Sequence, residues 1–185
     1  MELTLPKNEK ELSSLLNTAY TYACNRNYEK ALELCDWLSQ HSSTRIAGQR
    51  QRAAVKTHMG DIDGAIIDLK SVLETDRLEP ADFHGLGMLL LQNGSTKEAI
   101  EQFSAAVQIG EAAGNHYYTN SSLLFRAEAK LKICDFAGAR QDVSGLPSGY
   151  KAYFSGTGMR SREDIDSEAG VALQRKERAK FQFKK

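Results

Sequence analysis

Histidine and cysteine are the residue types in this chain that most often carry out chemistry, so their spacing is the first guide to function. The four histidines are His41, His58, His84 and His116, and none belongs to an H-x-x-x-H or H-E-x-x-H pattern. No G-x-S-x-G motif is present, and Gly156-Thr157-Gly158 is too short to form a phosphate-binding loop. We therefore expect hydrogen-bonded or solvated histidines, no catalytic residue, no metal site and no cofactor. The sequence predicts that the protein is not an enzyme.

The three cysteines, Cys24, Cys35 and Cys134, are an odd number without the spacing of metal ligands. We expect reduced thiols that pack as small apolar side chains. Residues 1–10 contain no apolar stretch of the kind found in secretory signals. No segment approaches the roughly 20 apolar residues that a membrane-spanning helix needs. The sequence therefore predicts a cytoplasmic protein without a membrane span.

The charge balance argues against general nucleic-acid binding. Lysine and arginine number 24, aspartate and glutamate also number 24, and the formal net charge is zero. Nucleic-acid-binding domains usually carry a basic excess. The stretch 175–185 is basic, but no larger basic patch supports it. We therefore expect no nucleic-acid partner.

A short pattern recurs along the chain: a turn, a hydrophobic residue, two further residues, an alanine and then an amphipathic helix. Its alanines are Ala31, Ala65, Ala99 and Ala139, so two intervals are 34 residues (65 − 31 and 99 − 65) and the third is 40 (139 − 99). Small residues also recur in the preceding stretch, at Ala19, Ala53, Gly87 and Ala127. Small side chains let two helices cross closely. The pattern predicts helix pairs repeated along the chain.

Turn residues mark where the helices of each pair end and begin. Gly60 and Gly94 stand where a first helix must stop, and glycine takes a left-handed C-cap without steric cost. Asp61 is placed to cap the helix that follows. Ser95, followed by Glu98, predicts a capping box for another helix.

The recurring residues and the 34-residue spacing resemble the tetratricopeptide-repeat (TPR) family, over roughly residues 11–143. The tryptophan usual near the start of the first helix is absent, and the closing proline is present only as Pro80. Gln49, Arg52 and Lys56 make the first helix of the second repeat unusually polar. The 40-residue interval resembles a longer variant of the repeat, whose helices are extended.

The resemblance implies an all-α fold, a right-handed helical-repeat solenoid of about four TPR helix pairs with a C-terminal capping helix. We expect a solenoid over residues 1–143, with repeats near 11–43, 45–78, 80–113 and 117–144. Residues 145–185 are expected to hold a linker, the capping helix and a basic tail. Within this region Tyr150–Phe154 is a candidate extended segment. Ser161 and Asp164 are placed to cap the last helix.

The resemblance also implies that a partner protein binds the concave face, which the first helices of the pairs line. Tyr20 and Arg50 are of types favoured at binding hot spots, and methionine is an adaptable contact. By helical register, the predicted binding residues are Leu16, Tyr20, Arg50, Ala54, His58, His84, Met88, Gln92, Leu124 and Glu128.

Several functions fit such a binding module. One TPR subclass holds the acidic C-terminus of chaperones with basic and amide side chains. None of the residues at the matching sites here is basic, so this subclass does not fit; they are Leu16, Tyr20, Gln51, Ala81 and Gly85. The small size of the chain and its C-terminal segment 146–165 are similar to bacterial repeat proteins, some of which serve as immunity partners of toxins. A toxin-immunity protein is therefore the first hypothesis. A secretion chaperone or assembly adaptor that holds an extended peptide is the second. A homodimeric structural or regulatory subunit is the third.

Overall fold

The computed structural model of the chain describes residues 4–75 and 79–182, with side chains as far as residue 180. The end of the second expected repeat, at residues 76–78, lies outside the described residues. So do residues 183–185 of the expected basic tail. Within the described residues no helix is both long enough and apolar enough to cross a bilayer.

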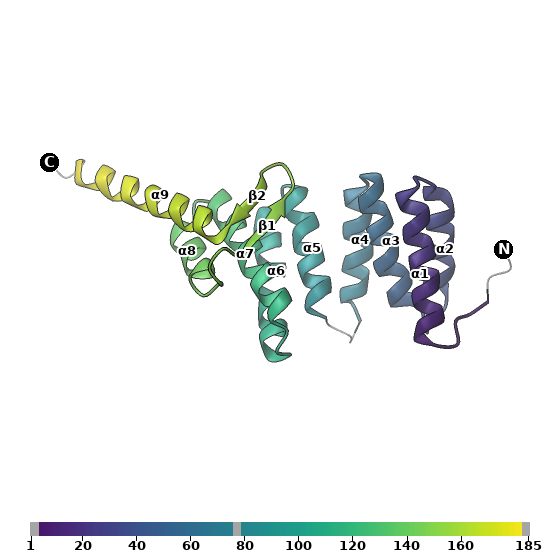
Figure 1. Cartoon of the computed structure of the whole chain (residues 1–185). Coiled ribbons are helices and arrows are strands. Elements are labelled where there is room, and N and C mark those ends of the chain that lie inside the picture. The colour runs from purple at the N-terminus through teal and green to yellow at the C-terminus, as the bar shows by residue number, and fades with distance from the viewer. Residues whose placement is uncertain (1–3, 76–78, 183–185) are drawn as a thin grey trace. The chain divides into compact units, whose positions relative to one another are not determined.

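The chain divides into two compact units, residues 1–77 and 78–185. The helices of the first unit run from purple to blue in Figure 1: α1 (Glu9–Cys24), α2 (Tyr28–Gln40), α3 (Arg45–Met59) and α4 (Ile62–Leu73). Each helix packs on the next one along the chain, and α1 also packs on α3. The unit is therefore two successive helix pairs.

The second unit also begins with two helix pairs. Its elements are α5 (Pro80–Gln92), α6 (Thr96–Ala112), α7 (His116–Lys132), α8 (Phe136–Ser144), β1 (Lys151–Phe154), β2 (Gly158–Ser161) and α9 (Arg162–Gln182). Helices α6 and α7 have 17 residues each, whereas α2 has 13 and α4 has 12. The 40-residue interval between alanines therefore corresponds to extended helices, as the sequence predicted.

Local side-chain hydrogen bonds begin most of the second helices. The carboxylates of Asp61 and Asp135 each accept the backbone N–H three residues ahead, at 2.9 and 3.0 Å. Ser95 makes no such bond, so the predicted capping box is not formed. Gly60 ends α3 with φ 83°, the left-handed conformation expected there. Cys134 occupies the matching position after α7 with φ 61°, which glycine would adopt without strain.

Close helix crossings explain why small residues recur. Ala31, Ala65, Ala99 and Ala139 are all fully buried. At Gly87 an added Cβ would lie 2.6 Å from the Phe103 ring, so α5 and α6 pack more closely than a larger residue allows. The thiol of Cys35 is buried as expected, and burial raises its pKa to about 12. Cys24 and Cys134 are exposed, which corrects the expectation that all three cysteines pack inside.

A buried carboxylate holds together each of the second and fourth helix pairs. Asp68 of α4 accepts hydrogen bonds from Arg52 at 2.6 and 3.0 Å, and Lys56 lies 2.8 Å away. Asp142 of α8 accepts hydrogen bonds from Arg126 at 2.7 and 2.9 Å, and the ammonium group of Lys130 lies 2.8 Å away. Arg52 and Lys56 thus contact the partner helix of their own pair, and Arg52 also reaches Asp36 of α2 at 2.6 Å. The polar α3 that departed from the family pattern is therefore part of the packing.

The segment after α8 forms a β-hairpin followed by a long helix. Strands β1 and β2 pair antiparallel, with Tyr153 opposite Met159. Asp164 accepts hydrogen bonds from the backbone and hydroxyl of Ser161, both at 2.8 Å, which confirms the predicted cap of the last helix. Arg162 donates to the carbonyl oxygen of Leu146, tying the start of α9 to the end of α8. Helix α9 then packs on α8.

Candidate functional site

In the first unit, two of the predicted binding residues meet at the surface. The rings of Tyr20 on α1 and His58 on α3 lie 5.6 Å apart between centroids, with their planes at 74°. Tyr20 is 49% exposed, and His58 is exposed as well. Tyr28, at the start of α2, donates its hydroxyl to the carbonyl oxygen of His58 at 3.2 Å. Three helices therefore position this aromatic pair.

The remaining predicted residues of the first unit differ in exposure. Ala54 is exposed one turn before His58, whereas Leu16 and Arg50 are half-buried. A hydrogen bond with the Cys24 side chain raises the pKa of Tyr20, so the phenol stays protonated at neutral pH. Tyr20, Ala54 and His58 make up the exposed part of the predicted surface in this unit.

His84, on α5, is a core residue of the second unit. Its side chain is only 8% exposed, and its two ring nitrogens lie 3.0 Å from the Ser122 hydroxyl and 3.2 Å from the Ser121 hydroxyl. Phe103 and Phe125 pack around the ring. Burial lowers the pKa of His84 to about 4. The imidazole is therefore neutral at physiological pH and links α5 to α7, which removes it from the predicted binding surface.

The hairpin packs on α7 next to residues that were expected to bind a partner. Phe154 of β1 stacks on Phe125 of α7 with centroids 4.3 Å apart. Arg160 of β2 reaches Glu128 at 3.3 Å, without forming a hydrogen bond to its Oε2 atom. Leu124 is 0% exposed and Glu128 is 5% exposed. Like His84, these two residues are buried, which corrects their assignment to an exposed binding surface.

The opposite face of the hairpin is exposed. Alternation along a strand places Phe154 on the covered face and Tyr153 on the outer face. Tyr153 is 66% exposed and Met159, directly across from it, is 57% exposed. Of the predicted residues on α5, Met88 is 40% exposed and Gln92 is exposed too. The second unit thus presents Tyr153 and Met159, an exposed pair that the sequence did not identify.

A signal for this hairpin is present in the sequence. Residues 151–154 and 158–161 are two short runs separated by a turn containing Gly156, which has φ 81°. The prediction of an extended segment at Tyr150–Phe154 captured only the first strand. Its partner strand, Gly158–Ser161, was not predicted, and Ser161 had been assigned only as a cap of the last helix.

Metal-binding side chains do not gather in the part of the chain that the structure describes. Among the residues that the structure describes, no group of three or more His, Cys, Asp or Glu side chains is placed to hold a metal ion. Burial raises the pKa of Glu128, and the positive charge of Arg160 opposes that rise. This carboxylate faces the guanidinium of the hairpin. The Glu128–Arg160 contact therefore helps to pack the hairpin against α7.

The fold is similar to solved structures of repeat proteins. Two are crystal structures of nearly identical TPR-like repeats from a kinesin light chain-like protein of Podosopora anserina. One, which carries a single substitution, is 20% identical, covers 94% of this chain and 91% of its own, and has a TM-score of 0.66. The other is also 20% identical, covers 97% and 94%, and has a TM-score of 0.67. No family model and no curated protein sequence matches this chain. The predicted fold is therefore confirmed: this is an all-α chain with the solenoid fold of TPR-like helical repeats.

Proposed function

We propose that this chain is a non-catalytic binding protein whose partner is a folded protein. The observation that carries the proposal is the hairpin. It packs on Phe125 and reaches Glu128 of α7, and it turns Tyr153 and Met159 outward. Tyrosine and methionine are effective contact residues, because they offer a large adaptable area for little conformational cost.

Toxin immunity is the specific form of this function that we favour. An immunity protein needs only to cover the active site of a folded toxin, and it performs no reaction of its own. The exposed Tyr20–His58 pair in the first unit and the Tyr153–Met159 pair in the second offer two such contact surfaces. Both pairs project from helices or strands that are packed against a core, so little order has to be gained on binding.

The peptide-chaperone alternative receives less support from the same residues. A chaperone that holds an extended segment needs free side chains along the inner helices. In the second unit Leu124 and Glu128 are buried, and Glu128 faces Arg160 of the hairpin. These two side chains are therefore not free to contact a peptide.

Capture of the tagged full-length chain from its own cell lysate, followed by mass spectrometry, tests the proposal. We expect one stoichiometric partner with a nuclease or other toxin domain, and neutralisation of that toxin when the two are expressed together. The double variant Tyr153→Ala, Met159→Ala or the variant Tyr20→Ala should weaken binding at least about tenfold. Ile67→Ala is the matched control, because Ile67 is an exposed aliphatic residue of α4 that belongs to neither pair.

Two other outcomes would contradict the proposal. Recovery of a mixture of unfolded export substrates would instead favour the chaperone. A folded partner that binds all these variants as tightly as the unmodified chain would place the contact on another surface.

A further inference from the structure

The outer face of α9 carries an exposed apolar residue between an acidic and a basic end. The inner face holds Ile165 and Ala169, both 0% exposed. On the outer face Val171 is 45% exposed. No atom lies within 4 Å of a Cβ added at the neighbouring Gly170. In Figure 1 the last turns of α9, drawn in yellow, project beyond α8.

Contacts with α8 and the turn before it fix which face of α9 points outward. The ammonium group of Lys176 lies 4.6 Å from the centre of the Phe136 ring and donates to the carbonyl oxygen of Cys134 at 3.3 Å. One turn before Gly170, Asp166 pairs with Arg140 of α8 at 2.8 Å. The orientation of α9 about its own axis is therefore set within the second unit.

Charged residues on this outer face follow a seven-residue spacing centred on Val171. Asp164 precedes Val171 by seven residues and Arg178 follows it by seven. Seven residues are nearly two helical turns, so the three side chains share one stripe, and each charge lies about 10.5 Å along the axis from Val171. Glu168 and Arg175 form a second row beside it. Several of these residues line an open groove next to Phe136.

We propose that α9 pairs antiparallel with the α9 of a second copy of this chain, with Val171 at the two-fold axis. In this arrangement Asp164 of the first copy lies level with Arg178 of the second. At the opposite end, Arg178 of the first copy lies level with Asp164 of the second. Glu168, which also pairs with Arg160 of its own chain at 2.7 Å, likewise comes within one residue of the level of the second copy's Arg175. The surface is therefore complementary to itself, as a two-fold interface requires.

The order of the charges favours a second copy over other occupants. An acidic partner such as a nucleic acid would be attracted by Arg175 and Arg178 but repelled by Asp164 and Glu168. A basic partner would meet the opposite conflict. A helix whose charges run in the reverse direction satisfies both ends, and an antiparallel copy of α9 supplies that order by symmetry.

Cysteine cross-linking of the full-length chain tests the geometry directly. Identical residues on a two-fold axis approach each other most closely, and a disulfide needs Cβ atoms about 4 Å apart. With Cys24→Ser and Cys134→Ser as background, Val171→Cys should form a covalent dimer on mild oxidation. Ile67→Cys in the same background is the matched control and should cross-link at least about tenfold more slowly. Equal rates for the two variants would overturn the proposal.

Sedimentation equilibrium tests the charge pattern independently of any other partner. We would follow the purified chain up to roughly 1 mM, because contacts made mostly by exposed ion pairs are weak. Arg175→Glu should weaken the dimer at least about tenfold, and adding Glu168→Arg to it should restore the association by exchanging the charges. The dimer should also weaken in 1 M salt. A chain that stays monomeric, or a dimer indifferent to these changes, would overturn the proposal without bearing on toxin binding.

Discussion

His84 illustrates how the environment of one side chain decides its role. The same imidazole would be a contact or switch group at the surface, but here it lies between two serine hydroxyls and a cluster of aromatic rings. Burial favours the neutral form, so the pKa falls to about 4 from its ordinary value near 6.5. The folded chain thus resists protonation at a position where the unfolded chain accepts it readily.

This difference predicts a loss of stability in acid. Because the folded pKa lies below the unfolded value, the contribution of His84 is fully present above about pH 6.5 and is lost as the pH falls towards 4. The loss should reach roughly 2–4 kcal/mol. Urea unfolding of the unmodified chain and of His84→Gln between pH 7.5 and 4.5 measures it. The variant should show a shallower decline over this range, and identical pH profiles would contradict the assignment.

At the level of helices, spacing between neighbours is set by the smallest side chains. Gly87 faces the ring of Phe103, whereas Gly170 faces open space, although both lie inside helices. A side chain at Gly87 would clash with the neighbouring helix, whereas a side chain at Gly170 would meet no other atom. The first allows α5 and α6 to approach, and the second only lowers the helix propensity of α9.

Alanine substitutions at these two positions should change stability in opposite directions. Gly87→Ala forces the Phe103 ring to shift and should cost about 1–3 kcal/mol. Gly170→Ala adds helix propensity without a contact and should stabilise by about 0.5–1 kcal/mol. Thermal unfolding followed by circular dichroism measures both changes. A stabilising effect of Gly87→Ala would mean that the helix pair can adjust freely.

The helices could be predicted from the sequence, whereas the covering of one of them could not. The alanines at 34-residue intervals indicate the helix pairs, because close crossing requires small residues at a fixed place. Helical register then assigned Leu124 and Glu128 to an exposed face, since register describes one helix at a time. Glu128 instead faces Arg160, and the neighbouring Phe125 stacks on Phe154; both hairpin residues lie about 30 residues further along the chain.

The polar residues of α3 show a related limit. Arg52 and Lys56 made α3 unusually polar, which weakened its resemblance to the family. Their partner, Asp68, lies on the next helix and has a side chain only 3% exposed. The sequence shows that α3 is positively charged. That these charges contact a buried carboxylate on the next helix becomes known only from the packing of the two helices.

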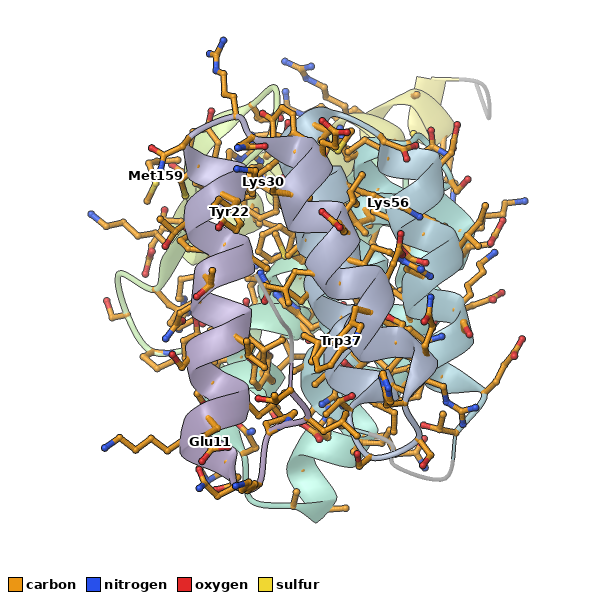
Figure 2. The ribbon with its side chains drawn as sticks, turned by 90° about the vertical axis from the view of Figure 1, so that its right-hand side faces the viewer. Glu11, Tyr22, Lys30, Trp37, Lys56 and Met159 are labelled. Carbon is orange, nitrogen blue, oxygen red and sulfur yellow. The ribbon has the colours of Figure 1, made fainter. Side chains whose placement is uncertain are left out.

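For the whole molecule, the division into two units has a measurable consequence. The only tryptophan, Trp37, packs against the core of the first unit, with Ala31, Leu34 and Cys35 among the buried residues of that cluster. Figure 2 labels Trp37 on α2 and Lys56 on α3, both in this unit. Trp37 fluorescence therefore reports on unfolding of the first unit, and circular dichroism reports on all helices.

Matched substitutions in the two buried acid networks exploit this difference. Asp68→Asn and Asp142→Asn each leave two cations without their buried carboxylate, and each should cost about 2–3 kcal/mol in its own unit. The urea midpoint from Trp37 fluorescence should fall clearly for Asp68→Asn and much less for Asp142→Asn. Equal shifts would show that one cooperative transition governs the chain. Asp166→Asn, which removes an exposed pair, is the control and should cost less than about 1 kcal/mol.

The two acid networks also bear on how the chain avoids folding incorrectly. Similar helices in one chain can pair with the wrong neighbour, a hazard common to repeat proteins. The positions equivalent to Asp68 in the first and third pairs are Leu34 and Gln102, which carry no charge, although Arg52 also contacts the exposed Asp36 of α2 at 2.6 Å. A mispaired α3 or α7 would therefore lose the buried carboxylate that its cations contact, a cost like that of Asp68→Asn. The alternation of uncharged and acidic residues at this position thus favours pairing of each helix with its correct partner.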